Sequence, residues 1–267
     1  MQSAIAYHPW RDAPRLNNRQ ALENSADERQ DMRDRIHKGI LQLLPLMNAS
    51  SKRLLDLSCG SGDSARRYAA LGFNVTPTSF HPESFNVPGL RCERVDLNGP
   101  MPFVDDSFDC VTLQEVVEHL ENVPHLFREV HRVLKPGGSF ILTTPNRLNL
   151  HSRLKYLLTG FFRGCRKPLA ADDAHPNWHV LDFQVLLWIG KRAGFEFAGA
   201  ARSQAKAMSH LLYWAMYPAL WGGTRLAAAE GRASREECIE LFHHMMGRQV
   251  LLNENLILHF KAKAAGS

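Results

Sequence analysis

A short apolar run that leads through a glycine turn into a helix constrains the fold of this chain more than any other feature. The run RLLDL (53–57) is closed by SCGSG, and a helical stretch follows from Ser64 to Leu71, where Gly72 ends it. An apolar run of this length before a glycine turn is typical of a buried strand. This stretch therefore predicts the strand–turn–helix order of an α/β protein.

The same alternation of strand and helix continues along the chain. Further strands are predicted at 74–78, 90–95, 108–113, 139–144, 195–200 and 256–261. Helices are predicted at 26–44, 115–120, 124–134 and 182–193. Repeated alternation of this kind predicts a doubly wound, mostly parallel sheet with helices on both faces.

Two segments interrupt this rhythm, at 147–180 and 201–248. Both are too long for ordinary connections, so we expect them to be inserted helical caps that shape a site. The predicted organisation is a single domain over residues 1–267. Its core comprises about 26–146, 181–200 and 249–263.

Composition excludes several classes of protein. Hydrophobic residues make up 45% and charged residues 22%, as in ordinary globular domains. No apolar run approaches the ~20 residues of a membrane span, and the first residues lack the apolar core of a signal peptide. Five cysteines without a CxxC pair predict free thiols in a reducing compartment, hence a cytoplasmic location. The net charge of +5 permits contact with anionic lipids or nucleic acid but requires neither.

Glycines and acids follow the predicted strands at the edge where doubly wound sheets bind ligands. Gly60 and Gly62 let the backbone turn and approach a ligand closely. Asp56 can accept hydrogen bonds from an ammonium group or an ordered water. Asp96 can accept from the exocyclic amine of an adenine, with Leu97 against the ring. Alternatively, Asp96 is only a turn residue before the Asn-Gly pair that follows.

Three motifs together resemble a known enzyme family: DLSCGSG (56–62), DLNGPMPFVDDSFDCVTLQEVVEHL (96–120) and REVHRVLKPGGSFILTTPN (128–146). They resemble class I S-adenosylmethionine-dependent methyltransferases of the type 11/12-like group, which includes quinone-biosynthesis O-methyltransferases. The resemblance covers roughly residues 50–150 and 180–200. It implies a seven-stranded Rossmann-like sheet with an antiparallel last strand, and S-adenosylmethionine as the cofactor.

The resemblance also implies which residues hold the cofactor. They are Asp56, Ser58, Gly60 and Gly62 for the methionine end, Ser79 and Phe80 at the end of the second strand, Asp96 and Leu97 for the adenine, and Gln114 on the fourth strand. Ser58 replaces the family's first glycine, and Ser79 replaces an acid that grips both ribose hydroxyls. One neutral hydrogen bond then replaces two charge-assisted ones, so we expect weaker cofactor binding unless a nearby group substitutes.

Methyl transfer to a hydroxyl needs an aligned nucleophile and a base. Helical spacing would place Glu115, Glu118 and His119 on one face, with His119 as the candidate base. Alternatively, Glu118 and His119 only form the end of a short helix and have no catalytic role. Glu-x-x-Glu-His also resembles the metal-binding run of some quinone and small-RNA O-methyltransferases, with His175 or His179 as a further ligand. These residues allow a divalent metal, but the sequence does not favour one.

Two rival functions share the glycine turn. Gly60 to Ala65 fits the G-x-G-x-x-A pattern of NAD(P)-dependent oxidoreductases, but Ser79 stands where that fold needs an acid. The other rival is a catalytically inactive, methyltransferase-like binding protein, which Ser79 alone supports. We therefore predict an S-adenosylmethionine-dependent methyltransferase that acts on oxygen of a small or lipid-like acceptor.

The block LLYWAMYPALW lies in the uncharged span 207–224. Pro218 is expected to kink or end a helix there, and the block is too short to span a bilayer. It either forms the buried face of the cap or lies in a membrane interface, flanked by Arg202, Lys206 and Arg225. Both readings favour a hydrophobic acceptor over a nucleic acid. The second places the protein peripherally at the inner face of a membrane.

Overall fold

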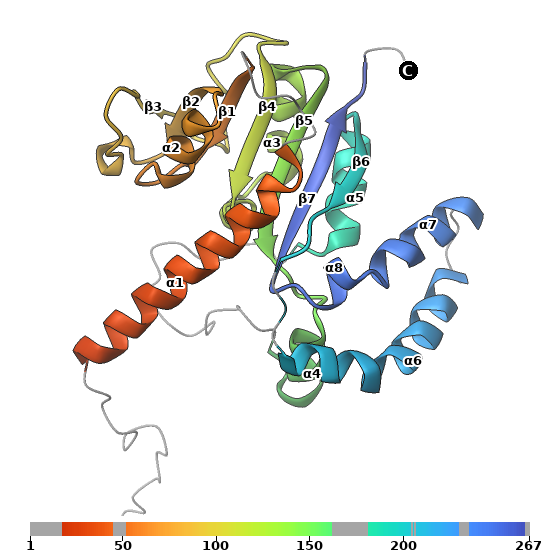
Figure 1. Ribbon diagram of the computed structural model, residues 1–267. Helices are drawn as coiled ribbons and strands as arrows, with labels where there is room; N and C mark the ends of the chain where they lie inside the picture. The colour runs from red at the N-terminus through yellow and green to blue at the C-terminus, as the bar shows by residue number, and fades with distance from the viewer. Residues whose placement is uncertain are drawn as a thin grey trace, which may run out of the picture. The chain divides into compact units, whose positions relative to one another are not determined.

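The computed structural model describes residues 18–44, 52–161, 181–203, 205, 207–229 and 235–264. The chain divides into two compact units between Arg35 and Ile36, within helix α1 (Asn18–Leu41). The sheet and the helices that follow α1 belong to the second unit (Figure 1), and the functional site is built from that unit alone.

Seven strands form one sheet in the order β3-β2-β1-β4-β5-β7-β6. Their bounds are β1 (Arg53–Leu57), β2 (Asn74–Ser79), β3 (Glu93–Arg94), β4 (Phe108–Gln114), β5 (Leu134–Pro145), β6 (Phe195–Ala200) and β7 (Asn255–Ala262). The pairs from β3 through to β5 are parallel, and β7 runs antiparallel to both of its neighbours. The predicted doubly wound sheet with an antiparallel last strand is confirmed. Its winding reverses between β1 and β4.

Helices connect these strands, and α2, α3 and α5 among them pack against the sheet. They are α2 (Asp63–Ala70), α3 (Val123–Val133), α4 (Leu150–Thr159), α5 (Phe183–Arg192), α6 (Ala207–Ala229), α7 (Arg235–Met245), α8 (Arg248–Leu251) and the 3-10 turns η2 (Pro82–Ser84) and η3 (Val117–His119). The start of α3 follows from its sequence, because Asn122 accepts a hydrogen bond from the His125 N–H and Pro124 occupies the first turn.

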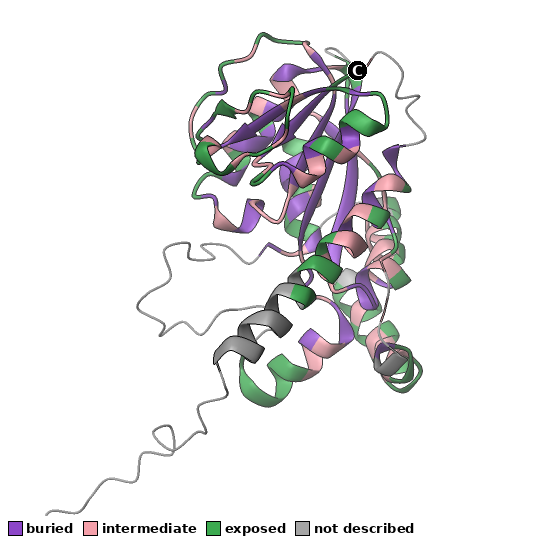
Figure 2. Ribbon diagram, turned by 60° about the vertical axis from the view of Figure 1, so that its left-hand side comes forward, coloured by how far each residue is buried: buried purple, intermediate pink, exposed green. Residues whose placement is uncertain are grey.

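The core lies on the faces of the sheet, where aromatic rings meet edge to face. Phe127 of α3 packs at 5.3 Å from Phe140 of β5 and at 5.8 Å from Phe260 of β7. Gly190 of α5 lies against Phe260, so a side chain at this position would overlap the ring. Figure 2 shows the strands as mostly buried, with exposed residues along the outer sides of the helices. This packing holds the strand ends in place.

Two local predictions are wrong. The strand expected at 90–95 is limited to the two residues of β3. The helix expected at 115–120 is absent, because Glu115 has a φ of 53° and only the single 3-10 turn η3 follows. The Glu115 N–H donates instead to the carbonyl oxygen of Thr143, which continues the pairing of β4 with β5. Sheet pairing therefore overrides the helical spacing at this point.

The two segments expected to be insertions contain helices that pack on one another in their described parts. Leu150 of α4 joins Met246, Leu251 and Leu252 in a second apolar cluster, which α6 covers with half-buried side chains. Pro218 does not end α6, which continues to Ala229. In Figure 1, α4 and α6 lie beyond the end of the sheet toward which β4 points, and α7 lies on the side of the sheet where β6 is. The end toward which β4 points is the carboxyl edge of the parallel strands.

Candidate functional site

Asp56 lies at the carboxyl end of β1 and is buried. Its two oxygens accept hydrogen bonds from the hydroxyls of Ser64, at 2.6 Å, and Thr112, at 2.9 Å. Burial raises the pKa of this carboxyl to about 6, although both hydrogen bonds act in the opposite direction. Asp56 thus ties the first turn of α2 to β4. Its expected contact with the methionine ammonium stays a prediction.

The turn after β1 adopts left-handed backbone conformations at three positions. The φ angles are 59° at Ser58, 55° at Gly60 and 95° at Gly62. Open space lies beside Gly60, whereas a side chain at Gly62 would overlap Phe85 and Val87. Gly60 therefore offers backbone for the close approach of a ligand, and Gly62 is required by the packing of the chain itself.

The end of β2 places Ser79 and Phe80 differently. Ser79 is buried, and its hydroxyl accepts a hydrogen bond from the His81 N–H at 3.1 Å. Phe80 is 47% exposed, and the guanidinium of Arg94 lies 5.4 Å from its ring centre. The next carboxylate along the chain is Glu83 in η2, 3.0 Å from the His81 ring. Glu83 is thus an acid close in sequence to the position that Ser79 occupies.

The segment after β3 carries the expected adenine residues. Asp96 is exposed, and one of its carboxylate oxygens accepts from the Asn98 N–H at 2.9 Å. Asp96 therefore acts as a turn residue, which was the alternative role considered for it. This hydrogen bond uses one carboxylate oxygen, and the second oxygen can accept from another partner. Leu97 is buried in the main apolar core, so only a small part of its side chain can meet a ring.

Gln114 ends β4, the fourth strand on which the resemblance placed it and which extends one residue beyond the expected 108–113. Its amide donates to the hydroxyl of Tyr68 at 3.1 Å. Tyr68 is fully buried on α2, and burial raises the pKa of its phenol well above the usual range. Sequence reasoning missed Tyr68, because a tyrosine within a helix carries no signal for a partner 46 residues away.

Two glutamates follow β4 at the same edge, of which Glu118 is buried and Glu115 is half-buried. Glu115 accepts from the Thr143 hydroxyl and from the Asn255 amide, each at 2.8 Å. Glu118 accepts from the Thr144 hydroxyl at 3.1 Å. Burial raises the pKa of both carboxyl groups, and the charge of Glu118 raises that of Glu115 further. Sequence reasoning did not identify their three partners. The only sequence feature that pointed to two of these partners is TTPN at the end of β5, where polar residues follow an apolar strand.

His119 lies at the end of η3 with 34% of its side chain exposed. Its Nε2 atom is 4.0 Å from a carboxylate oxygen of Glu118. Within the described residues, no group of three His, Cys, Asp or Glu side chains could hold a metal ion. As the structure places them, Glu115, Glu118 and His119 do not form such a group. His175 and His179 lie outside the described residues.

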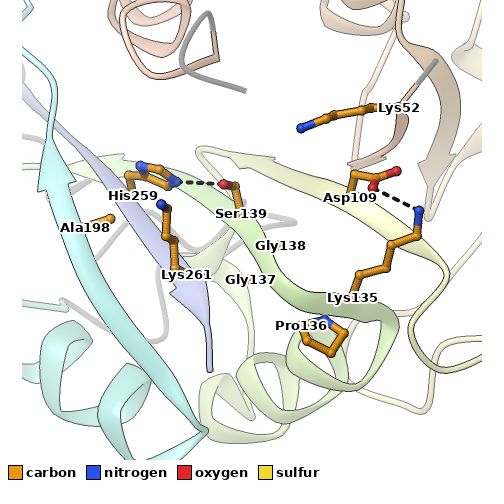
Figure 3. Close-up of a pocket in the computed structure, with 10 residues that line it drawn as sticks. All are labelled: Lys52, Asp109, Lys135, Pro136, Gly137, Gly138, Ser139, Ala198, His259 and Lys261. Atoms are coloured by element: carbon orange, nitrogen blue, oxygen red, sulfur yellow. Dashed lines mark hydrogen bonds and ion pairs between the residues drawn. The ribbon is translucent and has the colours of Figure 1, made fainter. Parts of the chain in front are cut away.

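A separate cavity of about 380 Å³ opens near the amino ends of β1 and β4, away from this edge (Figure 3). Lys135 pairs there with Asp109 at 2.9 Å, and the ring of His259 lies 2.9 Å from the Ser139 hydroxyl. Burial and the charge of Lys261 lower the pKa of His259 to about 4. This cavity contains none of the expected cofactor residues.

The family model described as a methyltransferase domain matches residues 28–198, which include the glycine turn, the two glutamates that follow β4 and His119. The chain belongs to this methyltransferase family. The predicted membership of the class I S-adenosylmethionine-dependent methyltransferases is confirmed, and S-adenosylmethionine is the cofactor that it implies.

Curated relatives match part of this methyltransferase. The ubiquinone biosynthesis O-methyltransferase of Xanthomonas oryzae pv. oryzae (strain PXO99A) is 34% identical over 110 residues, 38% of this chain and 46% of that protein. The demethylmenaquinone methyltransferase of Tropheryma whipplei (strain Twist) is 30% identical over 99 residues, 35% and 41% of the two chains. The methyltransferase therefore spans less than half the length of each of these relatives.

Solved structures share its fold. The methyltransferase bound to the Trm112 activator from Haloferax volcanii aligns with a TM-score of 0.56 at 17% identity, covering 92% of this chain and 97% of that one. The PH0226 protein from Pyrococcus horikoshii OT3 gives 0.53 at 18% identity, covering 88% and 92%. At these identities the likeness concerns the fold alone.

Proposed function

We propose that this methyltransferase moves a methyl group from S-adenosylmethionine to an oxygen atom of a small, apolar or lipid-linked acceptor. One observation carries the proposal. The open turn at Gly60, the glutamates that follow β4 and the segments 147–180 and 201–248 all begin at the carboxyl edge of the sheet. A ligand at this edge would lie at the point where the winding reverses.

We propose a single methyltransferase domain for this arrangement. Its core is about 26–146, 181–200 and 249–263, and its caps are 147–180 and 201–248. Both caps leave and rejoin the core at the carboxyl edge, since β5 and β6 end there and the antiparallel β7 begins there. They are thus attached where an acceptor would need cover from water.

The cofactor would lie along the turn at Ser58 and Gly60, with Asp96 and Gln114 further along the same edge. S-adenosylmethionine, when bound, supplies an electrophilic methyl group on a sulfonium. In this proposal Glu83 takes the ribose role that Ser79 cannot fill, because the Ser79 hydroxyl is buried and already accepts a backbone hydrogen bond. Glu83 has an exposed carboxylate, one oxygen of which lies 3.0 Å from the His81 ring, so that its other oxygen can meet a ligand from the solvent side.

His119 is proposed as the base that accepts the proton of the acceptor hydroxyl. Its partly exposed ring can meet an acceptor, and Glu118 lies behind it in the protein. When His119 takes the proton, the imidazolium and a Glu118 carboxylate attract each other in a poorly solvated place. Proton transfer and methyl transfer then leave a neutral methyl ether.

The surface of the insertions supports an apolar acceptor. Leu212, Tyr213 and Met216 of α6 pack on the second cluster, while Trp214 on the same helix is 73% exposed. Leu157 of α4 is 77% exposed. The helices within the described ranges include none with the length and hydropathy of a membrane span. We propose that 207–224 lies in the interface of a membrane at its cytoplasmic face, where the enzyme meets its acceptor.

The names of the relatives fit this acceptor class. A further relative, from Mycobacterium ulcerans, is named as a dimycocerosates methyltransferase and is 36% identical over 100 residues, 34% of this chain and 38% of that protein. Ubiquinone, menaquinone and dimycocerosates, the molecules in these three names, are all apolar. Those substrates belong to the relatives, and only their shared chemistry is carried over here. The acceptor proposed for this methyltransferase is therefore defined by an apolar body and a reactive hydroxyl.

Three measurements test the proposal. Calorimetry should show binding of S-adenosylhomocysteine, and labelled S-adenosylmethionine should label lipid or quinone extracts but not water-soluble metabolites. Absence of S-adenosylhomocysteine binding at millimolar concentration would contradict the enzyme function.

Flotation with anionic vesicles tests the membrane contact and should recover the wild type but not the Trp214→Glu variant. A wild type that stays unbound at low salt would contradict the membrane contact.

A further inference from the structure

Two free thiols lie side by side at the cofactor turn. The Sγ atoms of Cys59 and Cys92 are 3.8 Å apart, although 33 residues separate them in the sequence. Cys59 belongs to the glycine turn after β1, and Cys92 precedes β3. Both are partly accessible, whereas Cys110 is buried in β4. A disulfide has an S–S distance of about 2.05 Å, so closure requires the sulfurs to approach by about 1.8 Å.

The surroundings of the pair show how it would react. Burial raises the pKa of both thiols, and the charge of Asp56 adds to the effect. The hydrogen bond between the sulfurs raises the pKa of Cys59 and lowers that of Cys92. Cys92 is therefore the better thiolate of the two. Its attack on an oxidant becomes faster as the pH rises, because the thiolate is the nucleophile.

We propose that Cys59 and Cys92 form a reversible disulfide that couples the cofactor turn to the oxidation state of the surroundings. The oxidant is a low-molecular-weight disulfide such as oxidised glutathione. The Cys92 thiolate attacks one of its sulfurs and releases one glutathione thiolate. Cys59, on losing its proton, attacks the mixed disulfide at Cys92 and releases the second. The protein loses two electrons and two protons, and one glutathione disulfide becomes two glutathione thiols.

The consequence for the cofactor rests on the proposed function. Cys59 lies between Ser58 and Gly60, whose backbones are both left-handed, and its N–H donates to the Thr78 carbonyl at 2.8 Å. Drawing the Cys59 sulfur toward Cys92 pulls on this strained turn next to the open backbone at Gly60. The oxidised protein should therefore bind S-adenosylhomocysteine more weakly, by about threefold or more.

The test uses the full chain in glutathione buffers of increasing oxidation, followed by acid quenching, alkylation and peptide mapping. We expect loss of the mass of two hydrogen atoms, a peptide pair joined through Cys59 and Cys92, and full reversal by dithiothreitol. Cys92→Ser should lose the linkage. The control Cys238→Ser, in α7, should keep it.

Three outcomes would overturn the proposal. They are alkylation of both thiols after oxidation, a glutathione adduct that never resolves, and a linkage that involves another cysteine. Equal affinity of the reduced and oxidised forms for S-adenosylhomocysteine would overturn the coupling to the cofactor. The peptide map needs no ligand, so a failure of the proposed function would be seen separately, as absent binding by the reduced protein.

Discussion

The buried side-chain amide of Asn146 donates a hydrogen bond to the carbonyl oxygen of Asn253 at 2.8 Å. A second bond from the same amide reaches the Val250 carbonyl at 2.7 Å, and the Asn253 amide donates to the Ala201 carbonyl at 3.0 Å. Asn146 precedes the first insertion, Ala201 begins the second, and Asn253 follows it. The start of segment 147–180 and both ends of segment 201–248 therefore meet in one buried hydrogen-bond network.

Asn146→Ala should lower the free energy of unfolding by about 3 kcal/mol, because two buried carbonyl groups lose their donor. Chemical denaturation measures the change. Asn74→Ala, at an exposed position of β2, is the matched control and should have a small effect. An equal loss of unfolding free energy in Asn146→Ala and Asn74→Ala would show that the buried hydrogen-bond network does not stabilise the protein.

Ser58→Gly should stabilise the protein by about 1 kcal/mol, since a residue with a side chain is strained at a φ of 59°. Thermal unfolding with and without S-adenosylhomocysteine measures the gain. Ser61→Gly in the same turn has no positive φ to relieve and should not stabilise. If Ser58→Gly is neutral or destabilising, the serine contributes contacts that outweigh its strain.

Glu83→Gln should weaken S-adenosylhomocysteine binding by about tenfold, the effect of losing a charge-assisted hydrogen bond. Adding Ser79→Asp in the same chain should recover part of the affinity, because it restores an acid at the end of β2. Glu93→Gln, an exposed neighbour on β3, is the control for charge alone. Unchanged affinity in Glu83→Gln would remove Glu83 from the ribose role.

His119→Ala should lower kcat by about 100-fold or more, as expected for loss of a general base, with little change in cofactor affinity. Glu118→Gln should have a smaller effect and should shift the pH profile, since the carboxylate no longer stabilises the imidazolium. His243→Ala, exposed on α7, is the control. Equal kcat values for His119→Ala and the wild type would exclude His119 as the base.

His259 should make stability depend on pH. Above pH 6.5 the imidazole is neutral in both the folded and the unfolded state. As the pH falls from 6.5 toward 4, His259 becomes protonated in the unfolded chain but stays neutral in the folded protein, because folding lowers its pKa to about 4. Falling pH therefore favours the unfolded state. The loss of stability approaches about 3 kcal/mol at the acid end of this window.

His259→Gln keeps a partner for the Ser139 hydroxyl and should remove this part of the pH dependence. Urea denaturation between pH 4 and pH 7 measures the difference between variant and wild type. Parallel pH profiles for the two proteins would show that His259 does not titrate as described. Asp56 changes stability in the opposite sense over part of this range, so the comparison with the variant is essential.

Local sequence was sufficient for much of the sheet. The strand expected at 53–57 is β1, the strand at 195–200 is β6, and the helix at 182–193 contains α5. These elements are encoded by short-range features, namely apolar runs, helical spacing and the glycines that end them. The carboxyl-edge position of Asp56 followed from the same reasoning, because a residue that ends a strand lies at an edge, whereas the position of Gln114 was implied by the family resemblance.

The partners of those residues depended on the tertiary structure. Asn255 meets Glu115 from 140 residues away, through the antiparallel pairing of β7 with β5. Glu115 itself has a left-handed backbone where its spacing suggested a helix. The sequence alone determines which side of each helix or strand is buried, because the periodicity of its apolar residues specifies that side. Which hydrogen-bonding groups meet is set by the register of strands distant in the chain, and only the packed sheet decided it.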